Sequence, residues 1–88
     1  MKDNHEKNLR SCKVVENLLK DLRLNSGLRQ IDVAVHLGVQ QSVVSKYEDG
    51  ERRLDILEIR RLCDLFGMTL EEFVRELEKR LRNINETY

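Results

Sequence analysis

The stretch that most constrains this chain runs from residue 30 to residue 48, QIDVAVHLGVQQSVVSKYE, and predicts two short helices joined by a tight turn. Gly38 is the hinge between the two helices. The residues that recur at helical spacing before the hinge, and are predicted to face inward, are Ile31, Ala34 and Leu37. A short helix, a glycine turn and a second short helix with a polar face are the parts of a helix-turn-helix motif, whose second helix lies in the DNA major groove.

The second of these helices is predicted to have one apolar side and one polar side. Val44 and Tyr47 are predicted to face inward. The polar side carries Gln41, Ser42, Ser45 and Lys46. Glutamine pairs with adenine through two hydrogen bonds, lysine donates to guanine, and serine can do either, so we predict that these four residues contact base edges. A merely solvated helix face is the alternative interpretation.

Short motifs follow one another along the chain in an order that is more specific than any one of them. After an arginine-bearing first helix they are LRQ, LGV, QSVVSKYE and LFGMTLEEF. With this ordered set the chain resembles the phage repressor and Cro family, often called the XRE family, over residues 18 to 77. The resemblance implies an all-α fold, a compact five-helix bundle of the lambda repressor-like DNA-binding type, which binds operator DNA as a dimer and commonly acts as a repressor.

The resemblance also implies roles for residues in and around the first two helices. Arg23 is implied to pair with Glu48, which would tie the first helix to the helix-turn-helix motif. Gln30 lies at the N-terminus of the second helix, where free N–H groups favour a phosphate, and it is implied to contact the DNA backbone. Arg29 adds a positive charge beside it. The alternative for Gln30 is that it only caps the helix.

A charged loop, Glu51-Arg52-Arg53, follows the third helix. Loops at this place flank the sugar-phosphate backbone in the family that the chain resembles, so Arg52 and Arg53 are predicted to contact phosphates. Glu51 weakens the positive field of the loop. The alternative is that the two arginines pair with nearby acidic residues, in a chain of which 36% is charged.

Periodicity and composition shifts predict the limits of the domain. We expect a flexible arm over residues 1–8, a helix-turn-helix DNA-binding domain over residues 9–77, and an extension of the last helix over residues 78–88. The first helix is expected to run from Leu9 to Asn25. Its predicted inward stripe is Cys12, Val15, Leu18, Leu19 and Leu22.

The last two helices have clear start signals. Asp55 with Glu58, and Thr69 with Glu72, have the spacing of capping boxes. The third helix has a weaker cap, because glutamine stands at its expected N-cap, Gln40. The residues of the fourth helix that are predicted to face inward are Ile56, Ile59, Leu62, Cys63 and Phe66.

Apolar residues on the last helix alternate spacings of four and three, which is the pattern of a coiled-coil seam. They are Leu70, Val74, Leu77, Leu81, Ile84 and Tyr88. The first two, together with Phe73, are expected to belong to the domain core. Leu77, Leu81 and Ile84 then either pack back on the first helix or meet a second copy. We predict a homodimer interface, because a two-fold DNA site requires a two-fold protein.

Composition excludes several other classes. With 88 residues and 40% hydrophobic content, the chain is sized for one small domain. It has no metal-ligand set, no nucleophile beside a base and no phosphate-binding glycine loop, so we expect no enzyme activity, no cofactor and no metal. Cys12 and Cys63 are expected in the core, in a reducing compartment. No apolar run is long enough for a membrane helix, so a cytoplasmic protein without membrane contact is expected.

Together these patterns predict a sequence-specific transcriptional regulator of double-stranded DNA, which acts as a repressor and binds an inverted repeat as a dimer. Sixteen basic and sixteen acidic residues give a net charge of +0, without the basic excess that many DNA-binding proteins have. The alternative is a protein-interaction adaptor or an antitoxin, which would use the same fold to bind a toxin or another protein. A phage-type repressor, an antitoxin and a restriction-modification controller share this architecture.

Overall fold

The computed structural model of the chain describes residues 2–86, and for residues 2–12, 85 and 86 it describes the helical backbone alone. Five helices follow one another, namely α1 (Lys2–Asn25), α2 (Gln30–Leu37), α3 (Gln41–Glu48), α4 (Ile56–Phe66) and α5 (Leu70–Glu86). No strand occurs within residues 2–86, and the predicted all-α, five-helix fold is confirmed.

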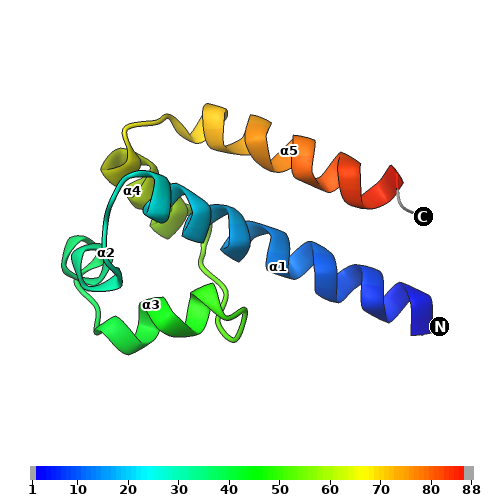
Figure 1. The fold of residues 1–88 in the computed structure, drawn as a ribbon, viewed down its shortest axis with the longest axis horizontal. Helices are drawn as coiled ribbons and strands as arrows, with labels where there is room; N and C mark the ends of the chain where they lie inside the picture. Colours follow the sequence, from blue (N-terminus) through cyan, green and yellow to red (C-terminus); the bar gives the residue numbers. More distant parts are fainter. Residues whose placement is uncertain (1, 87–88) are drawn as a thin grey trace.

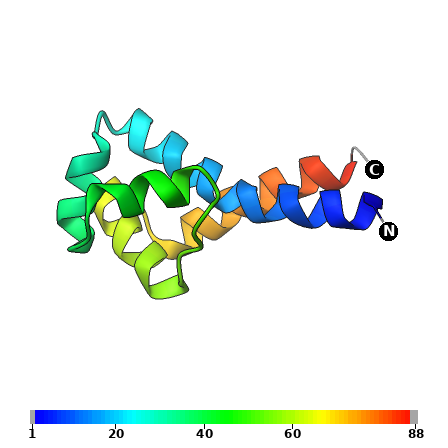
Figure 2. The ribbon, with the colours of Figure 1, turned by 90° about the horizontal axis from the view of Figure 1, so that it is seen from below.

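The two longest helices form one side of the molecule, and the three short ones gather at one end of it. α1 and α5 lie side by side and run in opposite directions, so both chain ends lie at the same end of the molecule (Figure 1). An ion pair of 2.9 Å between Arg80 and Asp21 joins them. Seen from below, α3 lies at the front, with α4 at the lower edge (Figure 2). The second helix of the predicted motif is therefore on an open face.

Apolar side chains from all five helices meet in a common core. Its buried members are Leu18, Leu19, Val33, Ala34, Leu37, Val44, Tyr47, Ile59, Leu62, Cys63 and Phe73. The inward orientation of Val44 and Tyr47, which was predicted from their spacing, is confirmed, and so is the burial of Cys63. Cys12 belongs to the segment whose side chains are not described, so its burial stays a prediction.

Two residues that are predicted to face inward are exposed instead, Ile31 on α2 by 39% and Ile56 on α4 by 56%. α2 turns Val33 into the core in place of Ile31. Residues three positions apart lie about 60° apart around a helix, because three residues fall short of a full turn. Ile31 and Leu37 are separated by two such steps, or about 120°, which is too wide an angle for both side chains to face the core. Ile56 is the first residue of α4 and precedes the turn that reaches the core.

The prediction of which apolar residues of α5 belong to the domain core is partly wrong. Phe73 is buried as expected, but Val74 is 41% exposed, and Leu77 packs against the core instead. Leu81 and Ile84 are half-buried. The spacing of four and three defines an apolar stripe, but it does not say which edge of the stripe is turned toward the rest of the domain. Leu77 is therefore partly buried against the core of its own protomer, and the homodimer interface at Leu77, Leu81 and Ile84 stays a prediction.

The first helix is longer than expected. α1 begins at Lys2 rather than at Leu9, so the segment predicted to be an arm is helical from residue 2. The first glycine is Gly27 and the chain has no proline, so nothing interrupts the helix, and lysine and glutamate favour it. The predicted end at Asn25 is confirmed. Tyr88, the last residue of the apolar pattern, lies outside the described residues.

Local hydrogen bonds define the starts of α4 and α5, as the capping pairs predict. The Glu58 N–H donates to the Asp55 carboxylate at 2.8 Å, and the Asp55 N–H donates to the Glu58 carboxylate at 3.0 Å. Thr69 and Glu72 exchange the same two bonds, at 2.8 and 3.0 Å. Gln40 stands at the N-cap of α3 and makes no side-chain cap bond, which confirms the weak cap.

A buried ion pair joins α1 to α3. The Nε atom of Arg23 donates to Oε2 of Glu48 at 2.6 Å, and its Nη2 donates to Oε1 at 3.0 Å. The remaining Nη1 donates to the backbone carbonyl of Leu28 at 2.8 Å. The pair that the resemblance implies is thus present, and it leaves Arg23 only 8% and Glu48 only 6% exposed. The hydrogen bonds to Glu48 raise the pKa of Arg23.

Removing one partner of this pair should be costly. Arg23→Ala is expected to lower the free energy of unfolding by about 3–5 kcal/mol, because it leaves the buried Glu48 carboxylate unpaired. The matched control is Arg29→Ala, which breaks an exposed ion pair with Asp32 and should change the free energy of unfolding far less. Urea unfolding followed by circular dichroism measures both. Equal losses in the two variants would contradict the importance of the buried pair.

Tyr47 offers a second test of the core. It is fully buried, its hydroxyl has no hydrogen-bond partner among the described residues, and burial raises its pKa. Tyr47→Phe removes the unbonded hydroxyl and keeps the ring, so the free energy of unfolding should stay unchanged or rise by up to about 2 kcal/mol. Tyr47→Ala should lower it by about 3–5 kcal/mol. Thermal unfolding distinguishes these outcomes, and a clearly destabilised Phe variant would show that the hydroxyl is bonded.

Candidate nucleic-acid interface

The turn between α2 and α3 is held by glycine and by a contact with α4. Gly38 has a φ of 71°, a left-handed conformation that few other residues adopt, and the next N–H, of Val39, donates to Ala34 at 3.0 Å. The Nε2 atom of His36 donates to the carbonyl of Arg61 at 2.8 Å, and the Arg61 guanidinium donates back to the His36 carbonyl at 3.2 Å. These bonds fix the end of α2 and so the start of α3.

The four residues predicted to contact bases lie on the outer side of α3. Gln41, Ser42 and Lys46 are exposed and Ser45 is half-exposed. Val44 and Tyr47, on the opposite side, anchor the helix in the core. An α-helix with its side chains is about 10–12 Å in diameter, which is close to the width of the major groove of B-DNA. The size and the polar side of α3 therefore suit insertion into that groove.

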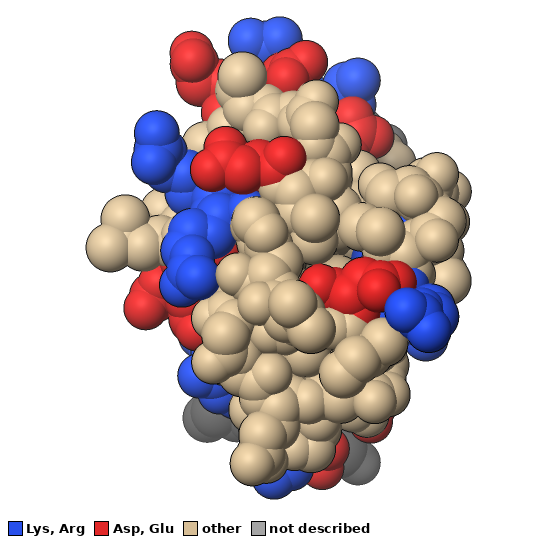
Figure 3. Space-filling model, turned by 90° about the vertical axis from the view of Figure 1, so that its left-hand side faces the viewer, with Lys and Arg blue, Asp and Glu red and all other residues tan. Residues whose placement is uncertain are grey.

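Charges on the end of the molecule next to α2 are mixed. Uncharged side chains cover most of this face, and the basic side chains on it lie beside acidic ones rather than in one continuous patch (Figure 3). This distribution agrees with the net charge of +0.

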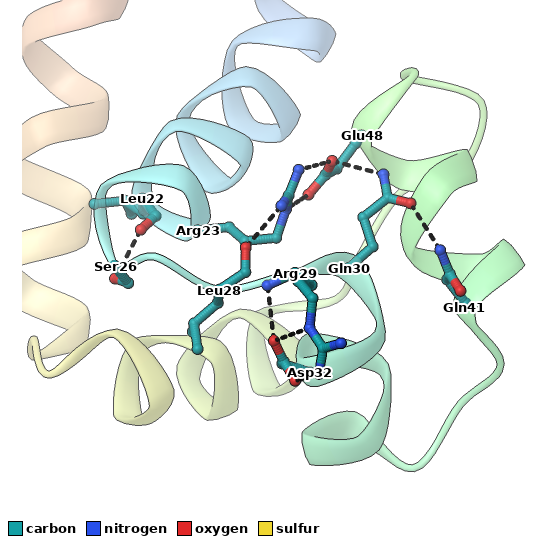
Figure 4. Close-up of polar contacts among 9 residues, drawn as sticks. All are labelled: Leu22, Arg23, Ser26, Leu28, Arg29, Gln30, Asp32, Gln41 and Glu48. Atoms are coloured by element: carbon teal, nitrogen blue, oxygen red, sulfur yellow. Dashed lines mark hydrogen bonds and ion pairs between the residues drawn. The ribbon is translucent and has the colours of Figure 1, made fainter.

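A chain of polar contacts connects the buried ion pair to the outer side of α3 (Figure 4). The Nε2 atom of Gln30 donates to Oε1 of Glu48 at 3.0 Å. The Nε2 atom of Gln41 lies 3.5 Å from Oε1 of Gln30, at the outer limit of a hydrogen bond. Gln30 and Gln41 are the first residues of α2 and α3, so the hinge brings the two helix starts together. This link between them is not evident from the sequence.

The remaining hydrogen-bonding capacity of Gln41 matches a base. A side-chain amide has two N–H donors and one carbonyl acceptor, and the contact with Gln30 uses one donor. One N–H and the carbonyl are left, and these are the groups that pair with N7 and N6 of adenine. Gln30 likewise keeps a second N–H beside the N-terminus of α2, where a phosphate would be favoured.

Arg29 occupies the N-cap position of α2 and is already engaged. Its Nη2 atom lies 3.0 Å from Oδ1 of Asp32, and its backbone N–H donates to Oδ2 at 2.8 Å. The hydrogen bonds from Arg29 lower the pKa of Asp32. The guanidinium is exposed, so a phosphate could reach it, but the phosphate would compete with this carboxylate.

The two arginines of the loop after α3 have different surroundings. Arg52 points toward α4, where its Nη2 atom lies 3.7 Å from Oε2 of Glu58, and its Nη1 atom is buried without a hydrogen-bond partner among the described residues. For Arg52 the structure therefore matches the alternative, a pair with a nearby acid. Arg53 is exposed.

Glu16 of α1 is a buried charged residue, because only 4% of it is exposed. No pattern in the sequence predicts a role for it. Desolvation raises the pKa of its carboxyl, while the positive charge of Arg53 acts in the opposite direction. The same loop touches α1 at Gly50, where a Cβ atom would lie 3.2 Å from Cγ of Lys13. Glu16 lies two turns before Arg23, and this spacing is the sequence signal for their shared side of α1.

The described part of the chain offers neither a metal site nor a membrane-spanning helix. Among residues 13–84, whose side chains are described, no three His, Cys, Asp or Glu side chains come together in a group that could hold a metal ion. None of the helices in this part is both long and apolar enough to cross a membrane.

Comparison with known proteins identifies the family. The family model described as "Helix-turn-helix domain" matches residues 17–77, which include all the contacts described above between α1, α2 and α3. The chain matches no curated protein.

Solved structures with the same fold were also found. An XRE-family like protein from Pseudomonas syringae pv. tomato shares 30% sequence identity and has a TM-score of 0.76, with 91% of this chain and 98% of that chain covered. The clp gene regulator ClgR from Corynebacterium glutamicum shares 14% identity, with a TM-score of 0.77 and coverage of 88% and 82%. A mutant of the restriction-modification controller protein C.Esp1396I shares 22% identity, with a TM-score of 0.73 and coverage of 81% and 90%.

The last two similarities concern the fold alone, whereas the family model and the Pseudomonas protein bear on the family. The motif order, the five-helix fold and the polar outer side of α3 agree with them. The chain therefore belongs to the helix-turn-helix proteins of the XRE type and is a DNA-binding transcriptional regulator.

Proposed function

We propose that the chain is a transcriptional repressor that binds an inverted repeat in double-stranded DNA as a homodimer. α3 would lie in the major groove, with Gln41, Ser42, Ser45 and Lys46 at the base edges. Gln30, Arg29 and Arg53 would contact phosphates, which set the register of the protein on the duplex but carry no sequence information themselves. Arg52 could join them only by leaving Glu58.

The observation that carries this proposal is the contact chain from Glu48 through Gln30 to Gln41. The buried carboxylate of Glu48 holds the side chain of Gln30, and Gln30 faces Gln41. The amide of Gln41 would therefore be oriented before DNA binds. Orientation in advance reduces the entropy lost on binding.

The decisive experiment is the selection of binding sites from a random pool of double-stranded DNA at near-physiological salt. Enrichment of an inverted repeat, with half-sites about one helical turn apart, is expected. Salt must be controlled because non-specific binding grows as the salt concentration falls. If no sequence is enriched, the net charge of +0 and the mixed surface charge favour the second candidate function, a protein-binding adaptor or antitoxin.

The glutamine contact can be tested by a double-mutant cycle on the selected site. Gln41→Ala is expected to weaken binding by about 1–3 kcal/mol and to relax the preference at one base pair. Gln30→Ala should weaken binding less, and the combined variant should deviate from additivity by about 0.5 kcal/mol or more. Fluorescence anisotropy titrations provide the affinities. Gln40→Ala, a neighbouring glutamine without a side-chain cap bond, is the control and should be additive with Gln41→Ala.

Phosphate contact by Arg53 has a separate readout. Arg53→Ala should weaken binding to all sequences similarly, and the slope of log K against log salt concentration should fall in magnitude by about 1. Lys79→Ala is the matched control, because Lys79 pairs with Glu76 on α5 and the substitution removes the same charge elsewhere. A changed base preference in the Arg53 variant, with an unchanged salt slope, would contradict the assigned role.

A further inference from the structure

Lys13 of α1 lies against the loop that follows α3. A Cβ atom at Gly50 would lie 3.2 Å from Cγ of Lys13, 3.7 Å from its Cδ and 3.5 Å from its Cε. Three methylene groups of the lysine therefore lie beside the glycine, which leaves room for them because it has no side chain. Lys13 is exposed, so its charged end extends past the loop into solvent.

Two hydrogen bonds hold this part of the loop to the last turn of α3. The N–H of Gly50 donates to the carbonyl of Tyr47 at 3.0 Å, and the N–H of Glu51 donates to the carbonyl of Lys46 at 2.9 Å. Gly50 has a φ of 80°, so the bonds and the left-handed glycine together form a Schellman motif. The loop that Lys13 contacts is therefore fixed relative to α3.

The arrangement of the helices places this loop on the side of the molecule that would face DNA. In Figure 1 α1 lies between α5 above it and α3 below it, and Figure 2 views the molecule from the side of α3. The major groove is bordered by the two phosphate backbones of the duplex, so residues just beyond the end of a helix in this groove lie near phosphates. Lys13 is the residue of α1 that contacts the loop at this place.

The charge of Lys13 is also available for a phosphate. Arg29 and Arg52 each lie beside a carboxylate, with which a phosphate would have to compete. Lys13 forms no ion pair with any residue whose side chain is described. Two acidic residues are near it, since Glu51 lies in the same loop and the buried Glu16 lies one turn further along α1, but neither is bonded to it.

We propose that Lys13 is a further phosphate contact of this protein, and that α1 takes part in DNA binding through it. Its ammonium group binds a phosphodiester of the backbone that passes the loop after α3, next to the phosphate contacted by Arg53. The inference rests on the proposed function and adds to it a contact from a helix to which the sequence patterns assign none.

A salt titration of DNA binding by the full chain tests this contact. Lys13→Met removes the charge but keeps an unbranched side chain beside Gly50, so the thermal unfolding temperature should stay near that of the wild type. Fluorescence anisotropy should show weaker binding, by a similar factor, to the selected site and to an unrelated duplex. The slope of log K against log salt concentration should fall in magnitude by about 1. Between about 50 and 200 mM salt, the wild type should therefore lose about 3.5 times more affinity than the variant.

Three further variants separate charge from structure. Lys13→Arg keeps the charge and should have the wild-type slope. Lys79→Met removes the charge of a lysine on α5, which α1 separates from α3 in Figure 1, and it should leave the slope unchanged. The chain that carries both Lys13→Met and Arg53→Ala should lose about 2 from the slope, because the two residues contact different phosphates.

The outcomes distinguish this inference from the proposed function. An unchanged slope for Lys13→Met overturns the inference alone, and so does a loss of affinity that Lys13→Arg shares, since that loss would come from packing on the loop. A lower slope for Lys13→Met on unrelated duplexes, in a protein for which no site is enriched, would support the phosphate contact and contradict sequence-specific repression. Wild-type protein that binds no duplex at all contradicts both.

Discussion

The proposed recognition surface depends on one buried carboxylate. Both oxygens of Glu48 accept hydrogen bonds from Arg23, and one of them also accepts a bond from Gln30. This single group therefore links α1, the start of α2 and the end of α3. A charge in a poorly hydrated place is stable only while its partners keep their geometry, so the same bonds that hold the bundle together also orient the glutamine beside the recognition helix. In the proposed function, stability and recognition are therefore coupled at this residue.

Much of the fold could be predicted from the sequence because its signals are local. The capping pairs of Asp55 with Glu58 and of Thr69 with Glu72 each lie within one helical turn, and the glycine at position 38 specifies the turn by itself. The errors concern which side of a helix is buried. Ile31 and Val74 are exposed although they fit an apolar pattern, because the buried side depends on where neighbouring helices lie.

The candidate site was harder to predict, because its contacts join residues far apart in the chain. The polar side of α3 follows from periodicity alone. The bond from Gln30 to Glu48 spans 18 positions and its contact with Gln41 spans 11, and no sequence spacing indicates either one. Arg52 and Arg53 look equivalent in the sequence, yet only the position of α4 decides that Arg52 lies beside Glu58. For the burial of Glu16, the sequence offers only its spacing from Arg23 on α1.

The two hydrogen bonds between His36 and Arg61 have a consequence for how the motif can move. They join the end of α2 to α4. Any displacement of α4 would therefore be passed to the glycine turn and to the start of α3.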